Sequence, residues 1–245
     1  MKLVLTIFFA LLFTATVFSQ PSKITVEYIT TQNGLSNNDV NCILKDQTGF
    51  MWFGTNDGLT RYDGYQLKNF RPANEFLHIL DLHETPDGLL WCASNIGLYC
   101  FDLETENFIA IFKAIGDSAN TLPANRISGI ATGSNSSLWL TTYNGLCHLE
   151  NISRSDLEHS GTKITIYNTG NSALRSNVLT AIENDENGTL WLGTADKLLQ
   201  NFDPIANRSL SLPSFIVNAE QRTITRINNL FNVDNTIWAG TMGAE

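Results

Sequence analysis

The stretch that decides the fold of this 245-residue chain is Asp46-Gln47-Thr48-Gly49-Phe50-Met51-Trp52-Phe53-Gly54-Thr55-Asn56-Asp57-Gly58-Leu59. It alternates turn residues with short apolar runs, and so predicts a turn, a strand, a second turn and a second strand. A near copy is Asp185-Glu186-Asn187-Gly188-Thr189-Leu190-Trp191-Leu192-Gly193-Thr194, and weaker copies recur elsewhere. All five tryptophans of the chain occupy the same place in a copy: Trp52, Trp91, Trp139, Trp191 and Trp238.

The spacing of these tryptophans predicts the fold class. Successive tryptophans are 39, 48, 52 and 47 residues apart. Repeats of about 40 to 50 residues with a Trp signature and glycine-rich turns are typical of β-propellers, in which each repeat forms one four-stranded blade. We therefore predict an all-β, incomplete propeller of about four full blades and a broken fifth. The expected blades are residues 35–71, 77–112, 125–167, 174–212 and, truncated, 224–245.

A second motif fixes the register within a blade. Leu-x-x-Asn-x-(Val/Ile/Leu) precedes three of the tryptophans, and its last residue lies 12 residues before the ring. Its copies are Leu35/Asn38/Val40, Leu122/Asn125/Ile127 and Leu174/Asn177/Leu179. In the first blade the expected strands are residues 40–45, 50–55, 59–62 and 65–70.

A large ring at a fixed strand position has a packing explanation. Neighbouring sheets stack about 10 Å apart, and a Trp between them buries roughly 150 to 250 Å². We expect each ring to wedge two blades, so that Trp191→Ala costs roughly 3 to 5 kcal/mol. The alternative, a row of sugar-stacking platforms, fits less well because ligand-binding aromatics need not recur at one strand position.

Two sets of glycines complete the repeat. Gly54, Gly193 and Gly240 lie two residues after a Trp, on the same face of the strand, and are expected to leave room for the next blade. The following turn contains Gly58, Gly97 and Gly145. The fourth blade has Lys197 at this turn position, so we expect a different turn type there.

The first twenty residues, 1–20, predict a secretory signal peptide. Met1-Lys2 precedes an apolar run from Leu3 to Phe18, with cleavage expected near Ser19 or Gln20. An uncleaved anchor is the alternative, but this run of 16 residues spans as a helix only about 24 Å of the roughly 30 Å hydrocarbon core. We therefore expect export. Residues 24–30 alternate apolar and polar side chains and are expected to form the strand that closes the propeller.

Charge and cysteine usage narrow the function classes. The net charge is −9 and no cluster of Lys and Arg occurs, which argues against nucleic acid as a partner. Cys42, Cys92, Cys100 and Cys147 lie in apolar strand contexts without metal-ligand or redox spacing, which favours buried free thiols. A Cys92–Cys100 disulfide across a hairpin stays open, because spacing alone does not decide it.

The motif Trp-x-Gly-Thr-x-x-Gly-Leu, preceded by Asp-x-x-Gly, resembles the two-component regulator propeller repeat. The opening Thr31-Gln32-Asn33-Gly34-Leu35-Ser36-Asn37-Asn38-Asp39-Val40 also resembles the usual beginning of such a sensor region. The resemblance covers about residues 24–245. It implies the periplasmic region of a hybrid two-component sensor histidine kinase, tethered to the inner membrane.

In that family, two seven-bladed propellers precede a β-sandwich, a membrane helix and a cytoplasmic kinase, and many members sense oligosaccharides. The resemblance thus implies an oligosaccharide ligand, the rest of the sensor chain as partner, a homodimer, and transcriptional regulation through a phosphorelay. We interpret the sequence as the N-terminal part of such a sensor. An arc of this kind would have unpaired strand edges.

Enzyme motifs are weak, and we predict no catalytic, cofactor-binding or metal-binding residue in this fragment. His78, His83, His148 and His159 show no His-x-His or His-Glu-x-x-His spacing. Asp46 and Asp185 lie three residues before their glycines, one more than in sialidase boxes. The alternative function is a periplasmic propeller enzyme of the streptogramin-lyase-like or glycan-cleaving type. Ligand-binding residues are left unassigned, because the loops differ in length.

Overall fold

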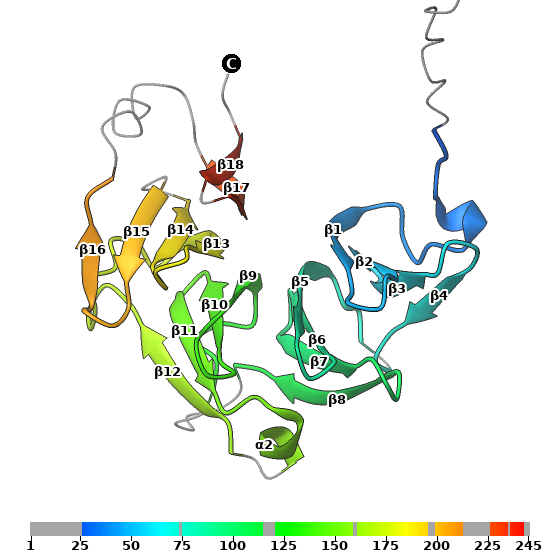
Figure 1. Ribbon diagram of the computed structural model, residues 1–245, viewed down its shortest axis with the longest axis horizontal. Helices are drawn as coiled ribbons and strands as arrows, with labels where there is room; N and C mark the ends of the chain where they lie inside the picture. The colour runs from blue at the N-terminus through cyan, green and yellow to red at the C-terminus, as the bar shows by residue number, and fades with distance from the viewer. Residues whose placement is uncertain are drawn as a thin grey trace, which may run out of the picture.

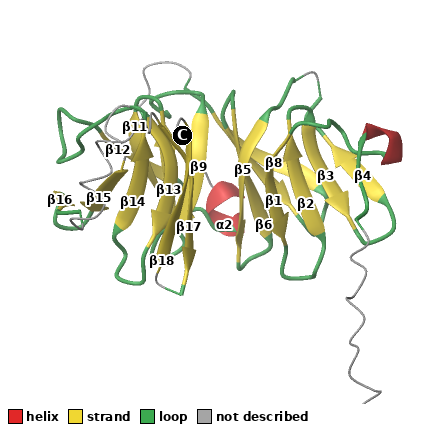
Figure 2. Cartoon of the chain, turned by 90° about the horizontal axis from the view of Figure 1, so that it is seen from above, coloured by secondary structure: helices red, strands yellow, loops and turns green. Residues whose placement is uncertain are grey.

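The computed structural model describes residues 26–73, 75–114, 121–158, 161–195, 199–212, 226–234 and 236–242. They form five antiparallel sheets that follow one another along an open arc (Figure 1). Seen from above, the sheets stand side by side as blades (Figure 2). The predicted all-β propeller, with four complete blades and a two-stranded fifth, is confirmed. The predicted signal peptide lies outside the described residues.

In each complete blade the four strands lie in chain order, from the inner side of the arc outward. Blade one contains β1 (Val40–Lys45), β2 (Met51–Thr55), β3 (Gly58–Tyr62) and β4 (Leu67–Phe70). Blade two contains β5 (Ile79–Thr85), β6 (Leu89–Ser94), β7 (Leu98–Asp102) and β8 (Asn107–Phe112). Blade three contains β9 (Ile127–Thr132), β10 (Leu138–Thr142), β11 (Gly145–Glu150) and β12 (Lys163–Tyr167). Blade four contains β13 (Leu179–Asn184), β14 (Leu190–Thr194), β15 (Leu199–Asp203) and β16 (Arg208–Leu210), and blade five β17 (Arg226–Val233) and β18 (Thr236–Met242).

The core lies between the blades, and the first four tryptophans each point from the second strand of a blade toward the next blade. Trp52 packs with Ile79, Leu90 and Phe101 of blade two, in an edge-to-face contact of 5.6 Å with the Phe101 ring. Trp91 and Trp139 lie in the clusters that join blades two to three and three to four. Because these three rings are at most 7% exposed, apolar burial there is nearly complete.

The two later tryptophans are less covered. Trp191 is half-buried against Ile227 and Leu230 of the two-stranded blade five. Trp238 is 64% exposed, because no described strand covers its face of β18. The cost of Trp191→Ala therefore falls toward the lower end of the range expected from the sequence.

The glycines beside the rings allow close approach of the blades. A Cβ on Gly54 would lie 2.3 Å from Cys42 Sγ and 2.6 Å from Ile79 Cγ2 of blade two. A Cβ on Gly193 would lie 2.9 Å from Ile227 Cγ2, whereas one on Gly240 would meet nothing closer than 3.8 Å. Close packing thus needs glycine only where a further blade follows.

The turn glycines are required by both conformation and space. Gly58, Gly97 and Gly145 have φ of +90°, +146° and +118°, a region that other residues avoid. A Cβ at each would lie 2.5 to 2.7 Å from the carbonyl oxygen at the end of the fourth strand. Lys197, the exception predicted for blade four, lies outside the described residues.

One local prediction, the closing strand at residues 24–30, is wrong. Residues 26–30 form no strand: Val26 and Tyr28 are 66% and 82% exposed, and the 3-10 helix η1 (Thr31–Asn33) follows. A closing strand needs a free sheet edge beside it, and β18 lies at the other end of the arc (Figure 1). The connection between β11 and β12 contains a short helix, α2 (Arg154–Glu158), with Asp156 in its first turn.

The four cysteines are free thiols, as the sequence favours. Cys92 packs in the cluster between blades one and two, and Cys100 in the cluster between blades two and three. The two thiols therefore lie on opposite faces of blade two, which excludes a bridge between them in this fold.

Candidate functional site

The inner strands of all five blades line a cavity of about 520 Å³. These strands are β1, β5, β9, β13 and β17, which converge on the inner side of the arc (Figure 1). Their apolar residues alternate with polar ones. The polar lining comprises Asn41, Asp81, His83, Ser128, Thr132, Glu183, Asn184, Asn228 and Asn229. A concave surface with a few convergent polar groups is the first place to expect a ligand.

A β-bulge recurs near the start of every inner strand, at the second residue of β1, β5, β9 and β13 and at the third residue of β17. The bulge re-aims a side chain, and in three blades that side chain donates to a backbone carbonyl of the next blade. The bonds are Asn41 Nδ2 to Ile79 at 2.8 Å, Ser128 Oγ to Leu179 at 2.8 Å, and Thr180 Oγ1 to Ile227. They fix the spacing of the blades at the cavity wall.

Asp81 takes over this role in blade two, where the bulge residue is the apolar Leu80. Its carboxylate accepts from the N–H of Ile130 in blade three at 2.8 Å and from that of Leu82 at 2.9 Å. Burial raises the pKa of Asp81 to about 6 despite these two bonds, and the charge of Glu183 adds to the rise. Near pH 6 this carboxyl can therefore gain or lose a proton.

Two further titratable groups share the cavity. Burial raises the pKa of Glu183 and lowers the pKa of His83. The His83 Nε2 atom is buried and has no hydrogen-bond partner among the described residues. A neutral imidazole and two carboxyls of raised pKa can exchange hydrogen bonds with a polar ligand. In the described part of the chain, no group of three His, Cys, Asp or Glu side chains is placed to hold a metal ion.

The Leu-x-x-Asn motif lies directly before three of the inner strands, β1, β9 and β13. Its leucines, Leu35, Leu122 and Leu174, are 5% exposed or less. Its asparagines each accept a backbone N–H from the segment that enters the blade: Asn38 from Thr31, Asn125 from Ala114 and Asn177 from Thr169. Each Asn thereby ties an incoming connection to the start of an inner strand.

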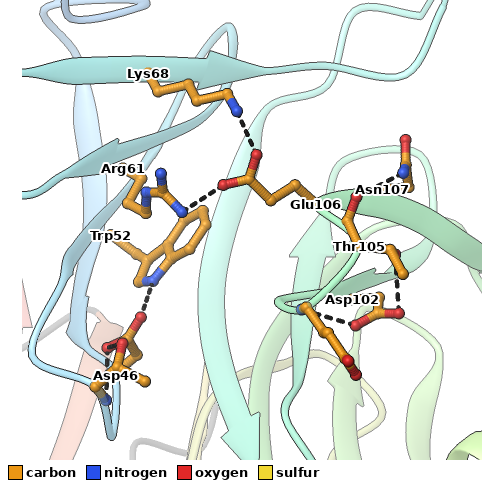
Figure 3. A network of polar contacts seen from close by, with 10 residues as sticks. Asp46, Trp52, Arg61, Lys68, Asp102, Thr105, Glu106 and Asn107 are labelled. Atoms are coloured by element: carbon orange, nitrogen blue, oxygen red, sulfur yellow. Dashed lines mark hydrogen bonds and ion pairs between the residues drawn. The ribbon is translucent and has the colours of Figure 1, made fainter.

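Polar contacts also join blades one and two away from the cavity (Figure 3). Arg61 of blade one, 4.6 Å above the Phe50 ring, pairs with Glu106 of blade two at 2.5 Å, and Lys68 pairs with the same carboxylate. The Trp52 indole donates to Asp46 Oδ2 at 2.7 Å. The two ion pairs of Glu106 hold the joint at its outer side, whereas the Trp52–Asp46 bond lies within blade one.

Blades two and three are joined at the outside by α2. Arg154 donates to both carboxylate oxygens of Asp102, with 2.9 Å between Nη2 and Oδ1. The Arg154 guanidinium is the main cause that holds the pKa of Asp102 at about 2. Because Asp102 is 1% exposed, this pair is a strong outer clamp.

The predicted structural positions lie apart from the cavity: none of the five tryptophans and none of the six repeat glycines lines it. Of the histidines, His148 stacks on Trp139 at 4.0 Å and bonds Ser137 at 2.9 Å. His78 lies before β5, and His159 is outside the described residues. Sequence reasoning missed Asp81, His83 and Glu183. They lie 10, 8 and 8 residues before a Trp, so alignment of the blades would have found polar residues in the inner strand.

Two stretches of the chain, residues 34–57 and 173–196, match a protein-family model. The family is the two component regulator propeller. Both stretches run from the Leu-x-x-Asn motif through the inner strand to the Trp-x-Gly-Thr strand. The resemblance found in the sequence is thereby confirmed for blades one and four, which each keep both the Leu-x-x-Asn motif and the Trp-x-Gly-Thr motif.

Solved propellers share the fold. The extracellular domain of BT4673 from B. thetaiotaomicron, described as a hybrid two component system, has a TM-score of 0.67 and 22% identity, over 88% of this chain and 26% of that one. For BT3049 of the same organism, described likewise, the values are 0.58, 21%, 88% and 34%. Virginiamycin B lyase from Staphylococcus aureus has 0.60 and 17%, over 84% of this chain and 65% of that one.

This chain therefore spans about a quarter of the BT4673 domain and a third of the BT3049 domain. No curated protein matches the sequence. Within the described residues, no helix has the length and apolar character that crossing a membrane requires.

Proposed function

We propose that this chain is a ligand-sensing propeller region of a hybrid two-component sensor histidine kinase. The match of two blades to the regulator propeller model carries the proposal, and the shared fold of two extracellular sensor domains supports it. In this role the region is exported to the periplasm and catalyses no reaction itself. The rest of the sensor chain tethers it to the inner membrane, forms a homodimer and regulates transcription through a phosphorelay.

The proposed ligand is an oligosaccharide bound in the cavity of the inner strands. A volume of about 520 Å³ falls within the range usual for small-molecule sites. The amides of Asn184, Asn228 and Asn229 offer donors and acceptors to sugar hydroxyl groups, and the carboxyls of Asp81 and Glu183 offer acceptors.

Sensing would follow from the fact that different blades build the cavity wall. All five blades contribute one strand each, so a ligand that contacts several strands binds one arrangement of the blades better than another. It then shifts the population toward that arrangement. The change can pass to the rest of the sensor chain without chemistry in this region.

Calorimetric titration with a panel of neutral oligosaccharides tests the proposal. We expect saturable binding by at least one member, weakened about tenfold by Asn184→Ala or Asn229→Ala in the cavity wall. Asn107→Ala, in the outer strand β8, is the matched control and should change nothing. Binding that survives both cavity variants, or no binding by any member of the panel, would contradict the proposal.

A propeller enzyme of the streptogramin-lyase-like or glycan-cleaving type is the second candidate. One observation favours it: Asp81, His83 and Glu183 line one cavity and have shifted pKa values. Incubation with streptogramin or glycan substrates followed by product analysis separates the two functions. Product that disappears in His83→Ala supports the enzyme, and unchanged substrate supports the sensor.

A further inference from the structure

Three side chains from two blades meet where β9 and β17 begin, a region called the rim of the cavity because residues that follow in both strands line the cavity. Arg126 directly precedes β9, Tyr143 lies in the turn between β10 and β11, and Arg226 begins β17. The guanidinium carbons of the two arginines lie 5.3 and 5.8 Å from the centre of the Tyr143 ring. Arg226 Nη2 also donates to Tyr143 Oη at 2.8 Å. Arg226 therefore reaches across blade four to blade three.

The two arginines hold equivalent places in their blades. Each directly precedes a buried isoleucine, Ile127 or Ile227, at the start of an inner strand whose next residues line the cavity. The convergence is thus a property of the rim, produced by arginine at the same position in blades three and five.

Neither guanidinium is neutralised in the described part of the chain. None of the ion pairs found there includes Arg126 or Arg226. The Nε atom of each is buried without a hydrogen-bond acceptor among the described residues. A guanidinium carries five N–H donors, and the bond to Tyr143 uses one of them. The causes of the Asp81 and Glu183 pKa shifts include burial and backbone bonds but no arginine.

An anion would stabilise this arrangement. Buried donors without acceptors and two like charges around one ring both cost free energy. A planar or tetrahedral oxyanion removes both costs, because its oxygens match the donor fork of arginine. The chain as a whole has a net charge of −9, so a site of two unpaired cations is a local exception to its electrostatics.

We propose that Arg126 and Arg226 form a binding site for the carboxylate or sulfate group of a small ligand, with Tyr143 holding the two guanidinium groups. The carboxyls of Asp81 and Glu183, which line the cavity, repel this group and keep it at the rim. The uncharged part of such a ligand then faces the amide-lined wall. This site does not depend on the sensor function, since an enzyme would bind an anionic substrate by the same contacts.

Isothermal titration of the chain at constant ionic strength tests the site, with sodium glucuronate, sodium sulfate and glucose as probes. We expect saturable binding of at least one of the two anions. Arg126→Gln and Arg226→Gln should each weaken it about tenfold or more. Arg175→Gln is the matched control, because Arg175 is an exposed arginine before β13 that makes no ion pair among the described residues.

The probes also separate the sources of the oxyanion. Tighter binding of glucuronate than of sulfate, with no effect of either glutamine variant on glucose, supports a sugar acid, and the reverse order of the anions supports a free inorganic ion. Near-ultraviolet circular dichroism checks the fold of each variant. Absence of saturable binding by the unmodified chain overturns the proposal even if a variant fails to fold. So does equal binding by both glutamine variants and Arg175→Gln.

Discussion

Replacing Trp52 and Trp91 with Phe, one at a time, separates the indole hydrogen bond from the burial of the ring. Both rings are 1% exposed or less, so the two changes remove similar apolar area. Trp52 also loses its 2.7 Å bond to the Asp46 carboxylate, and such a bond to a charged group contributes about 1.5 to 3 kcal/mol. The Trp91 Nε1 atom is buried without a partner among the described residues, so its removal breaks no bond. We expect Trp52→Phe to destabilise by about 1.5 to 3 kcal/mol more than Trp91→Phe.

Urea unfolding followed by far-ultraviolet circular dichroism measures this difference, because that signal comes mainly from the peptide backbone. Equal losses for the two variants, within about 0.5 kcal/mol, would refute the reasoning. The slope of the free energy with urea should stay unchanged in both. A changed slope would mean that the variants alter more than the two side chains.

Lowering the pH tests the same Trp52–Asp46 hydrogen bond, because it removes the charge of Asp46. Burial raises the pKa of Asp46, but hydrogen bonds from Thr48, Trp52 and Phe50 outweigh it, so the pKa lies below its ordinary value. A carboxyl group whose pKa is lower in the folded state stabilises the fold at pH values above its pKa in the unfolded state. This stabilisation is lost as the pH falls through the pKa of the folded state. The excess cost of Trp52→Phe should therefore shrink below about pH 4.

Three further outcomes are expected from urea unfolding. Gly54→Ala should cost about 1 to 3 kcal/mol through overpacking, whereas Gly240→Ala, with an open position, should stay within about 0.5 kcal/mol of the unmodified chain. Gly145→Ala should cost more than Gly49→Ala: both need a positive φ, but only at Gly145 would the Cβ meet a carbonyl oxygen, and equal costs would contradict this. Because the pKa of Asp81 is raised to about 6, its stabilising effect is complete below about pH 4 and is lost as the pH rises to about 6. Asp81→Asn should flatten the decline in that window, and an unchanged pH profile would contradict the assignment.

Much of the fold could be predicted because the blade repeats its chemistry. The Trp strand, the turn glycine after it and the Leu-x-x-Asn motif recur at a fixed register, so the strands of blade one were predicted within two residues at each end. The motif also has a local cause, since each of its asparagines caps a neighbouring backbone N–H. Local chemistry of this kind is visible in one sequence.

What failed depends on contacts between distant residues. The alternation in residues 24–30 predicts a strand, but a strand also needs a neighbouring sheet edge, which alternation does not reveal. The cavity residues Asp81 and Glu183 are 102 positions apart. Their proximity becomes evident only when the inner strands are aligned blade by blade.

The rim cluster was harder still to foresee. Arg126 and Arg226 are 100 residues apart, and each alone is an ordinary arginine at the start of a strand. Their common contact with Tyr143 depends on the angle between blades three and five, which follows from packing. No motif encodes that angle.

The outer ion pairs have a mechanical consequence. An ion pair of Glu106 connects blades one and two on the outer side of the arc. An ion pair of Arg154 connects blades two and three in the same way. Among the described residues, no ion pair connects blades three and four. Their contact includes the Ser128 bond at the inner edge and apolar packing. This joint is therefore bound at its inner edge, but no ion pair of the described residues holds its outer side. We expect the arc to widen more readily at this joint than at the two joints that carry an ion pair.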